Sequence, residues 1–122
     1  MYKNHDVGKE GESVARRYLE SSNYKVIEKN FRCQKGEIDI IAEDMKTNEY
    51  CFIEVKTRSN KEFGRPAVAV DKAKQRKITM TTRLYVLKNK LQNSLIRFDV
   101  IEVYKKDKFY INHLKNCEFK NN

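Results

Sequence analysis

The sequence lacks the long apolar segments that membrane and secreted proteins carry. No stretch of its 122 residues approaches the roughly 18 consecutive apolar residues of a membrane span. The N-terminal stretch MYKNHDVGKEGE contains no apolar run and does not resemble a secretory signal. We therefore expect a cytoplasmic protein that has no membrane partner.

Cysteine and histidine are too sparse for a disulfide framework or a zinc site. The three cysteines, Cys33, Cys51 and Cys117, are odd in number and widely spaced, and no CxxC motif occurs. The two histidines, His5 and His113, lie near opposite ends of the chain. This pattern favours ordinary packing, with Cys51 as a small core residue.

Internal repeats, low-complexity segments and linkers are also missing. The one proline, Pro66, follows Gly64 in FGRPAVAV, which indicates a loop that leads into the next element. A chain of 122 residues without an internal boundary predicts a single domain, residues 1–122. Its core is expected at about 6–115, and residues 116–122 are expected to be frayed.

Positive charge, by contrast, is abundant. The 26 lysines and arginines exceed the 17 acidic residues and give a net charge of +9. Such an excess favours a polyanionic partner, above all nucleic acid, although a basic surface also serves solubility. The excess is concentrated between Asp71 and Lys90, where one acid stands against seven basic residues: Lys72, Lys74, Arg76, Lys77, Arg83, Lys88 and Lys90.

The periodicity of apolar residues predicts an α/β fold. Helical spacing marks residues 6–22, with Asp6 as the N-cap, and a second helix with Ala73, Ile78, Thr81 or Thr82, and Tyr85 on its inner face. One mixed five-stranded sheet flanked by helices would bury the central strands on both faces. The predicted helices are 6–22 and 70–90, and the predicted strands are 24–31, 38–43, 50–57, 95–104 and 109–114, the last at an edge.

Strands 38–43 and 50–57 are joined by a connection short enough for a hairpin. A turn centred on Lys46 and Thr47 would place Ile41 opposite Phe52 and Ile40 opposite Ile53. In this register apolar residues meet apolar residues, whereas a slip of one residue would put charges on opposite faces. The same register places Asp39 opposite Glu54 and Glu37 opposite Lys56.

Two carboxylates on directly opposed strand positions repel, because their Cβ atoms lie only about 5 Å apart. Lys56, two residues after Glu54, would offset part of the charge, and a divalent cation would offset more. Mg²⁺ prefers oxygen ligands of this kind, completed by waters and substrate phosphates. A metal site is therefore one interpretation of Asp39 and Glu54. The other is a structural ion-pair network among Asp39, Glu54, Lys56 and Glu37.

The motif GEIDIIAED…CFIEVKTR resembles the signature of PD-(D/E)xK nucleases. Four segments resemble, in order, the YraN-like family of small bacterial proteins: GKEGESVARRYL, NFRCQKGEIDIIAED, FIEVKTRSNKEFGRPAVAVDKAKQRKI and RFDVIEVY. The resemblance covers about residues 8–115. It implies a core similar to those of restriction endonucleases and archaeal Holliday-junction resolvases, with the element order αβββαββ.

The resemblance also implies roles for individual residues. Asp39, Glu54 and the Val55 carbonyl would bind Mg²⁺ or Mn²⁺, and Lys56 would orient the attacking water and stabilise developing charge. Glu12, on the first helix, matches a helical glutamate that would hold a metal-bound water. Gln75, early in the basic helix, matches a polar position near the site.

Several basic residues are candidates for contacts with nucleic-acid phosphates, and the alternative for each is a solvated surface position. The phosphate-contact candidates are Arg58, Arg65, Lys72, Lys74, Arg76 and Lys77.

Asp99 is expected to pair with Arg97 or a loop, and Tyr18, Tyr85 and Tyr104 are expected in the core.

The resulting functional expectation is a metal-dependent nuclease that hydrolyses structured or branched DNA. The alternatives are a DNA-binding protein that keeps the fold without hydrolysis, and a structural protein in which the charges form an ion network. A homodimer is compatible with the resolvase-like reading, but no dimer surface is legible in the sequence.

Overall fold

The computed structural model describes residues 3–58 and 71–117. Within these ranges it has the expected element order, helix, three strands, helix, two strands. The α/β prediction is therefore confirmed. The elements are α1 (Lys3–Ser21), β1 (Tyr24–Cys33), β2 (Gly36–Asp44), β3 (Glu49–Arg58), α2 (Lys72–Lys88), β4 (Ile96–Lys105) and β5 (Phe109–Leu114).

Three details of the helices differ from prediction. Helix α1 already begins at Lys3, so Asp6 lies inside it and is not its N-cap. Helix α2 begins at Lys72 and is capped by Asp71, whose side chain accepts a hydrogen bond from the Lys74 amide at 2.9 Å. Ala73 is exposed, not on the inner face, because the buried side of α2 is formed by Ile78, Thr81 and Tyr85.

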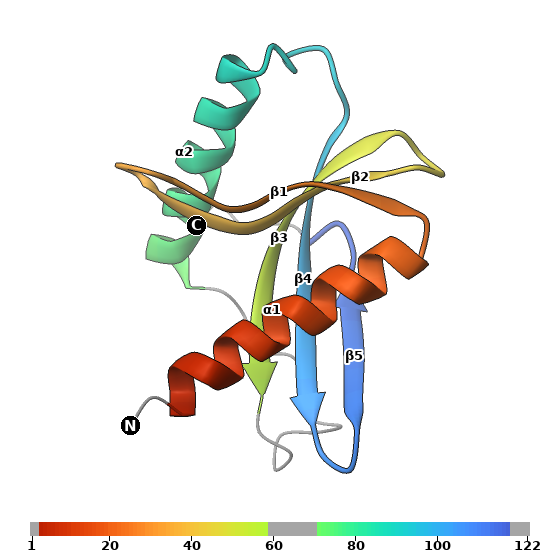
Figure 1. Ribbon diagram of the computed structural model, residues 1–122. Helices are drawn as coiled ribbons and strands as arrows, with labels where there is room; N and C mark the ends of the chain where they lie inside the picture. Colours follow the sequence, from red (N-terminus) through yellow and green to blue (C-terminus); the bar gives the residue numbers. More distant parts are fainter. Residues whose placement is uncertain (1–2, 59–70, 118–122) are drawn as a thin grey trace.

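The five strands form one mixed sheet in the order β1-β2-β3-β4-β5, with β5 at an edge as predicted (Figure 1). Strands β3 and β4 are parallel and are separated in the chain by α2, whereas every other neighbouring pair is antiparallel. The β1–β2 hairpin lies across the direction of β3, β4 and β5.

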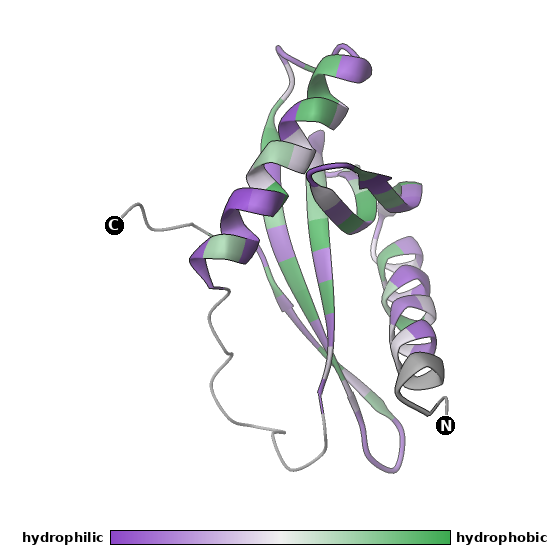
Figure 2. Cartoon of the chain, turned by 90° about the vertical axis from the view of Figure 1, so that its left-hand side faces the viewer, coloured by the Kyte–Doolittle hydropathy of each residue, from purple (hydrophilic) through white to green (hydrophobic). Residues whose placement is uncertain are grey.

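Each face of the sheet is covered by one helix, and Figure 2 shows α1 and α2 on opposite sides. Helix α1 buries Ala15 and Leu19 against one apolar cluster, which includes Ile40, Ala42, Cys51, Ile53 and Val103. Helix α2 buries Ile78 and Tyr85 against the other, which includes Phe31, Ile38, Ile41 and Phe52. Tyr104 is also buried and Tyr18 packs against the first cluster, so the three tyrosines lie where the sequence predicted.

The β2–β3 register is the predicted one, with Ile41 opposite Phe52 and Ala42 opposite Cys51. The ladder, however, ends at the pair Ile40–Ile53. Beyond this pair the Asp39 carboxylate accepts a hydrogen bond from the Val55 amide at 2.8 Å. A side chain thus takes a donor that a continuing ladder would have used, and the strands separate at the predicted site.

The turn between β1 and β2 rests on α2. Gly36 has a φ of 154°, and a Cβ there would lie 3.0 Å from Thr81 Oγ1. Glycine suits this position because a side chain would be strained and crowded. At the other end of the chain, the Asn116 amide donates to Asp99 at 2.9 Å and the Cys117 amide to Phe98 at 2.7 Å, so residues 116 and 117 are bound to β4.

In the part of the chain that the structure describes, neither helix is long and apolar enough to span a membrane.

Candidate functional site

Asp39 lies where β2 and β3 separate, between the two apolar clusters. Ile38 packs with the α2-side cluster and Ile40 with the α1-side cluster, so the alternation of the strand is interrupted at Asp39. Burial of the carboxyl group and the nearby charge of Glu54 raise the pKa of Asp39 to about 7. Near neutral pH this group can therefore take up or release a proton.

Glu54 is a buried acid on β3, and its partner comes from α2. Its Oε2 atom lies 2.8 Å from Nζ of Lys74, in the first turn of the helix. The hydrogen bond to Glu54 raises the pKa of Lys74, which stays positively charged. The expected compensation by Lys56 is thus supplied by Lys74, a residue predicted from its sequence context to contact phosphate.

Glu12 brings α1 to the same site, as the family resemblance implied. Its side chain and that of Asp39 line a cleft of about 230 Å³, together with residues of α1 and β1. Partial burial and the charges of Glu37 and Glu54 raise the pKa of Glu12. Three acidic side chains from α1, β2 and β3 therefore influence one another electrostatically.

The position of Glu12 depends on a close approach of helix and sheet. Gly11, the preceding residue, is buried, and a Cβ at this position would collide with the side chain of Thr57 on β3. Glycine lets the α1 backbone approach β3 more closely than another residue would allow. The sequence pattern does not indicate this contact.

The other predicted site residues lie near the acids. Lys56 follows Glu54 by two residues on β3 and is half-buried, and Val55 holds Asp39 through its amide. Gln75 is half-buried in the first turns of α2, one residue after Lys74. Their predicted catalytic roles remain predictions.

Glu37 does not pair with Lys56, contrary to expectation. It forms an ion pair of 2.9 Å with Arg32 on the adjacent strand β1, and both side chains are largely exposed. The reason is that the β2–β3 ladder stops before it reaches Glu37, whereas the β1–β2 ladder continues and places Arg32 directly opposite.

The donor set is suited to a metal ion that keeps open coordination positions. Within residues 3–58 and 71–117 no three His, Cys, Asp or Glu side chains are grouped so that they alone would hold a metal. Mg²⁺ and Mn²⁺ do not require such a cage, because one or two carboxylates with waters and substrate phosphates suffice. The mutual repulsion of Asp39 and Glu54, which contributes to the raised pKa of Asp39, is the feature that a cation would relieve.

The phosphate-contact candidates fall into different environments. Lys72, Arg76 and Lys77 are exposed on α2, and Lys74 is bound to Glu54. The side chain of Arg58 is only 10% exposed and lies 3.8 Å from Oε2 of Glu102. Burial makes Arg58 a weaker candidate than the helix residues. Arg65 lies outside the described residues, as do Phe63, Gly64 and Pro66.

Glu102 is a fully buried acid on β4 that the sequence analysis did not single out. It stands opposite Lys56 in the parallel β3–β4 pair. Its Oε1 atom accepts hydrogen bonds from the Tyr104 hydroxyl and the Asn112 amide group, both at 3.0 Å, while its Oε2 atom accepts none among the described residues. In the segment VIEVY, Glu102 stands between apolar residues of a strand with a strongly apolar sequence. This pattern is the signal that could have revealed Glu102.

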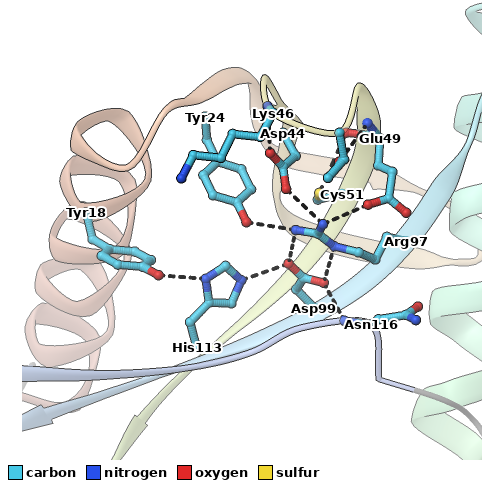
Figure 3. A network of polar contacts seen from close by, with 11 residues as sticks. Tyr18, Tyr24, Asp44, Lys46, Glu49, Cys51, Arg97, Asp99, His113 and Asn116 are labelled. Atoms are coloured by element: carbon cyan, nitrogen blue, oxygen red, sulfur yellow. Dashed lines mark hydrogen bonds and ion pairs between the residues drawn. The ribbon is translucent and has the colours of Figure 1, made fainter.

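A second polar cluster, centred on Arg97 of β4, lies at the opposite end of the β2–β3 pairing (Figure 3). Arg97 makes two hydrogen bonds of 2.9 Å to Asp99, which confirms the predicted pair. It also donates to Asp44 and Glu49 at 2.9 Å and to the Tyr24 hydroxyl at 2.8 Å. The guanidinium group is thus surrounded by acceptors from four strands, β1, β2, β3 and β4.

Asp99 extends this cluster to β5 and α1. It lies 2.7 Å from Nε2 of His113, whose Nδ1 lies 2.7 Å from the Tyr18 hydroxyl. Burial alone would raise the pKa of Asp99, but hydrogen bonds from His113, Arg97 and the Asn116 amide outweigh it and hold the pKa below its usual value. Each of these side chains forms a hydrogen bond or ion pair with another member of the cluster, which is the pattern of a structural network.

Comparisons with known proteins place the chain among small bacterial proteins. The sequence model of the uncharacterised protein family UPF0102 matches residues 11–103. A UPF0102 protein of Clostridioides difficile is 49% identical over 114 residues, which cover 93% of this chain and 97% of the relative. UPF0102 proteins of Clostridium botulinum (strain 657) and Caldanaerobacter subterraneus are 48% and 46% identical, over 84% and 80% of this chain and 82% and 79% of the relatives. The resemblance inferred from the four motifs is thereby confirmed, and the chain belongs to the uncharacterised protein family UPF0102.

Proposed function

We propose that this protein is a metal-dependent nuclease that hydrolyses phosphodiester bonds in structured or branched DNA. The single observation that carries the proposal is the placement of Asp39. Its half-buried carboxyl group sits where β2 and β3 part, and burial together with the charge of Glu54 raises its pKa. A protein that needed only a stable sheet would gain nothing from two interacting acids at this point.

The protein residues would divide the work between them. Asp39 and Glu54, with the Val55 carbonyl, would hold Mg²⁺ or Mn²⁺. When bound, such an ion lowers the pKa of a coordinated water and neutralises charge on the phosphate. The half-buried ammonium of Lys56 would stabilise negative charge that develops at phosphorus. Glu12, which lines the same cleft as Asp39, would hold a water by hydrogen bonding.

Exposed cations would supply the affinity for the substrate. Lys72, Arg76 and Lys77 lie on α2, the helix whose first turn reaches Glu54 through Lys74. Contacts to backbone phosphates fix the register of a nucleic acid without reading its sequence. The arrangement thus supports binding by shape and charge, as expected for a junction, flap or other branched substrate.

The test is cleavage of a labelled panel of duplex, single-stranded, flap, four-way-junction and RNA substrates with Mg²⁺ or Mn²⁺. We expect one substrate to be cut, and Glu54→Ala and Lys56→Ala to abolish cutting. Glu20→Ala and Lys25→Ala, which remove an exposed acid and an exposed lysine from other parts of the surface, serve as matched controls and should cut normally. Cutting that survives both site substitutions would refute the proposed catalytic roles.

A second function, nucleic-acid binding without hydrolysis, is favoured by the ion pair of Lys74 with Glu54. Lys74 neutralises Glu54 without a metal, as a fold that had no use for catalysis would require. The Lys74→Ala protein separates the two functions. For a nuclease, releasing Glu54 should tighten Mn²⁺ binding several-fold in calorimetry. For a binding protein, Mn²⁺ would remain unbound while salt-sensitive DNA binding persists in wild type, Glu54→Ala and Lys56→Ala.

A further inference from the structure

Helix α2 has a second apolar stripe, on the side that faces away from the sheet. Its inward side is formed by Ile78, Thr81 and Tyr85. The outward stripe consists of Met80, Leu84 and Leu87, which are 43%, 42% and 59% exposed. Figure 2 shows hydrophobic and hydrophilic segments alternating along the α2 ribbon. A chain with a lean apolar content thus leaves three large apolar side chains of one helix in water.

The spacing of this stripe is that of a helix–helix seam. Counting outward positions along α2 gives Ala73, Lys77, Met80, Leu84 and Leu87, at alternating intervals of four and three residues. This is the spacing of the a and d positions of a heptad repeat, with Lys77 as the one charged member. Such a stripe is narrower than the apolar face of a helix that lies on a membrane, and it suits a partner helix.

The charges beside the seam indicate the kind of partner. In the heptad numbering Arg76 and Arg83 occupy g positions, and Lys88 occupies an e position. All three side chains are exposed, and Asp71 at the N-cap is the one acid in the sequence of residues 71–90. A partner helix with acidic residues at its own flanking positions would therefore be attracted.

The same charges disfavour a second copy of this chain. A parallel pair would place Arg83 opposite Lys88 of the second copy, and an antiparallel pair would place arginines of the g positions opposite one another. Both arrangements bring like charges together at the rim of an apolar contact, and such juxtaposition opposes association.

We propose that the outward face of α2 is a docking site for an acidic amphipathic helix of another protein. The apolar seam of Met80, Leu84 and Leu87 would bury the apolar positions of the partner, and Arg76, Arg83 and Lys88 would pair with its acids. This surface is independent of the acidic site. It lies on the exposed side of α2, away from the residues that pack on the sheet. It shares Arg76 with the proposed phosphate contacts but uses none of Asp39, Glu54 or Glu12.

The test uses the full chain and two labelled helical peptides of about three heptads. Both peptides carry the same leucine seam, but one has glutamates and the other lysines at the flanking positions. Fluorescence anisotropy should show binding of the glutamate peptide and at least about ten-fold weaker binding of the lysine peptide. Failure of the glutamate peptide to bind would overturn the proposal.

Substitutions separate the seam from the surrounding charge. The double variant Met80→Ser, Leu84→Ser removes two apolar contacts and keeps every charge, so glutamate-peptide binding should fall at least about ten-fold. Leu95→Ser, which removes a 64% exposed leucine outside α2, is the matched control and should bind like wild type. Peptide binding that is unchanged in the double variant would show that the basic residues act without the seam, and would overturn the proposal.

Other occupants give distinct results. Sedimentation that reveals a wild-type dimer, lost in the double variant, would assign the face to a second copy. Binding to vesicles that contain anionic lipid, lost in the double variant and accompanied by no peptide binding, would assign it to a membrane surface. Either result would replace the proposal. DNA binding should be the same in wild type and double variant, so a failure here is distinguishable from a failure of the nuclease proposal.

Discussion

The two polar clusters of this protein shift the pKa values of their aspartates in opposite directions. Around Arg97, Asp99 and Asp44 have pKa values below their usual range, because hydrogen bonds and the guanidinium charge outweigh burial. Around Asp39 the balance is reversed, and burial together with Glu54 raises the pKa to about 7. Both clusters bury acids, but only the first supplies enough donors and positive charge.

This difference separates a structural cluster from a chemical one. The Arg97 cluster closes on itself, with distances of 2.7 to 2.9 Å between its ionisable side chains. At the Asp39 site the compensation of negative charge is incomplete. Lys74 forms an ion pair with Glu54, whereas Asp39 accepts a hydrogen bond from the uncharged Val55 amide. Natural proteins tolerate such incomplete compensation mainly at functional sites.

Removing the centre of the closed cluster should have the largest effect. Arg97→Ala would leave Asp99 and Asp44 buried without their main partner, and the free energy of unfolding should fall by about 3–5 kcal/mol. Urea denaturation at pH 7 measures this loss. Arg97→Lys, which keeps the charge but not the fork of donors, should lose less. A loss below about 1 kcal/mol for Arg97→Ala would contradict the view that this cluster stabilises the fold.

Neutralising Asp39 should raise the free energy of unfolding, whereas Arg97→Ala should lower it. The folded state binds the Asp39 proton more tightly than the unfolded state, so this group lowers stability as the pH rises from about 4 to about 7. Asp39→Asn keeps an acceptor for the Val55 amide and removes the repulsion. It should raise the metal-free stability at pH 8 by on the order of 2 kcal/mol and leave it nearly unchanged at pH 4.

Urea denaturation of wild type and Asp39→Asn at several pH values gives the difference directly, because the other titrating groups are common to both proteins. A variant that is less stable than wild type at pH 8 would show that Asp39 is a satisfied structural acid. The comparison between the two clusters would then fail.

The packing of α1, the helix that carries Glu12, can be altered by a substitution that changes no charge. Gly11→Ala introduces a Cβ that collides with the Thr57 side chain, and it should cost about 1–3 kcal/mol of stability. Gly8→Ala, one turn earlier on α1, meets no atom within 4 Å and should be neutral or slightly stabilising. Thermal denaturation of the two variants provides the check. Equal effects of both alanines would mean that α1 does not pack as closely on β3 as described.

The smallest effect is expected where an ion pair is exposed. Arg32 and Glu37 lie 2.9 Å apart, as close as the buried pairs of Arg97, but their side chains are 75% and 46% exposed. Glu37→Gln should change the stability by less than about 0.5 kcal/mol, because solvent screens such a pair. A loss above 1 kcal/mol in urea denaturation would show that geometry outweighs burial in this protein.

The sequence was a good guide where one face of an element had to be apolar. The β2–β3 register followed from matching Ile41 with Phe52, because a slip by one residue would have exposed the apolar face. It was a poor guide where a side chain competes with the backbone. The end of the ladder at Ile40 depends on Asp39 accepting a hydrogen bond from Val55, which alternation does not reveal.

Long-range polar contacts were likewise beyond pattern reasoning. Lys74 and Glu54 meet only because α2 folds back onto the sheet, and nothing in either local sequence indicates the pair. The Arg97–Asp99 pair was predictable because the two residues lie on one strand, whereas the links to Asp44 and Tyr24 needed the fold. Ala73 was misplaced because a small side chain is compatible with either helix face.

One edge of the sheet has a consequence for solubility during folding and storage. Within the described part of the chain strand β1 pairs with β2 alone, so its outer side offers backbone donors and acceptors to any other extended chain. Lysines at 25 and 29 and an arginine at 32 are exposed along this strand, and its register shifts between Val26 and Glu28. Charge and irregularity together oppose strand addition, and a β1 edge stripped of these cations would be the place where aggregation begins.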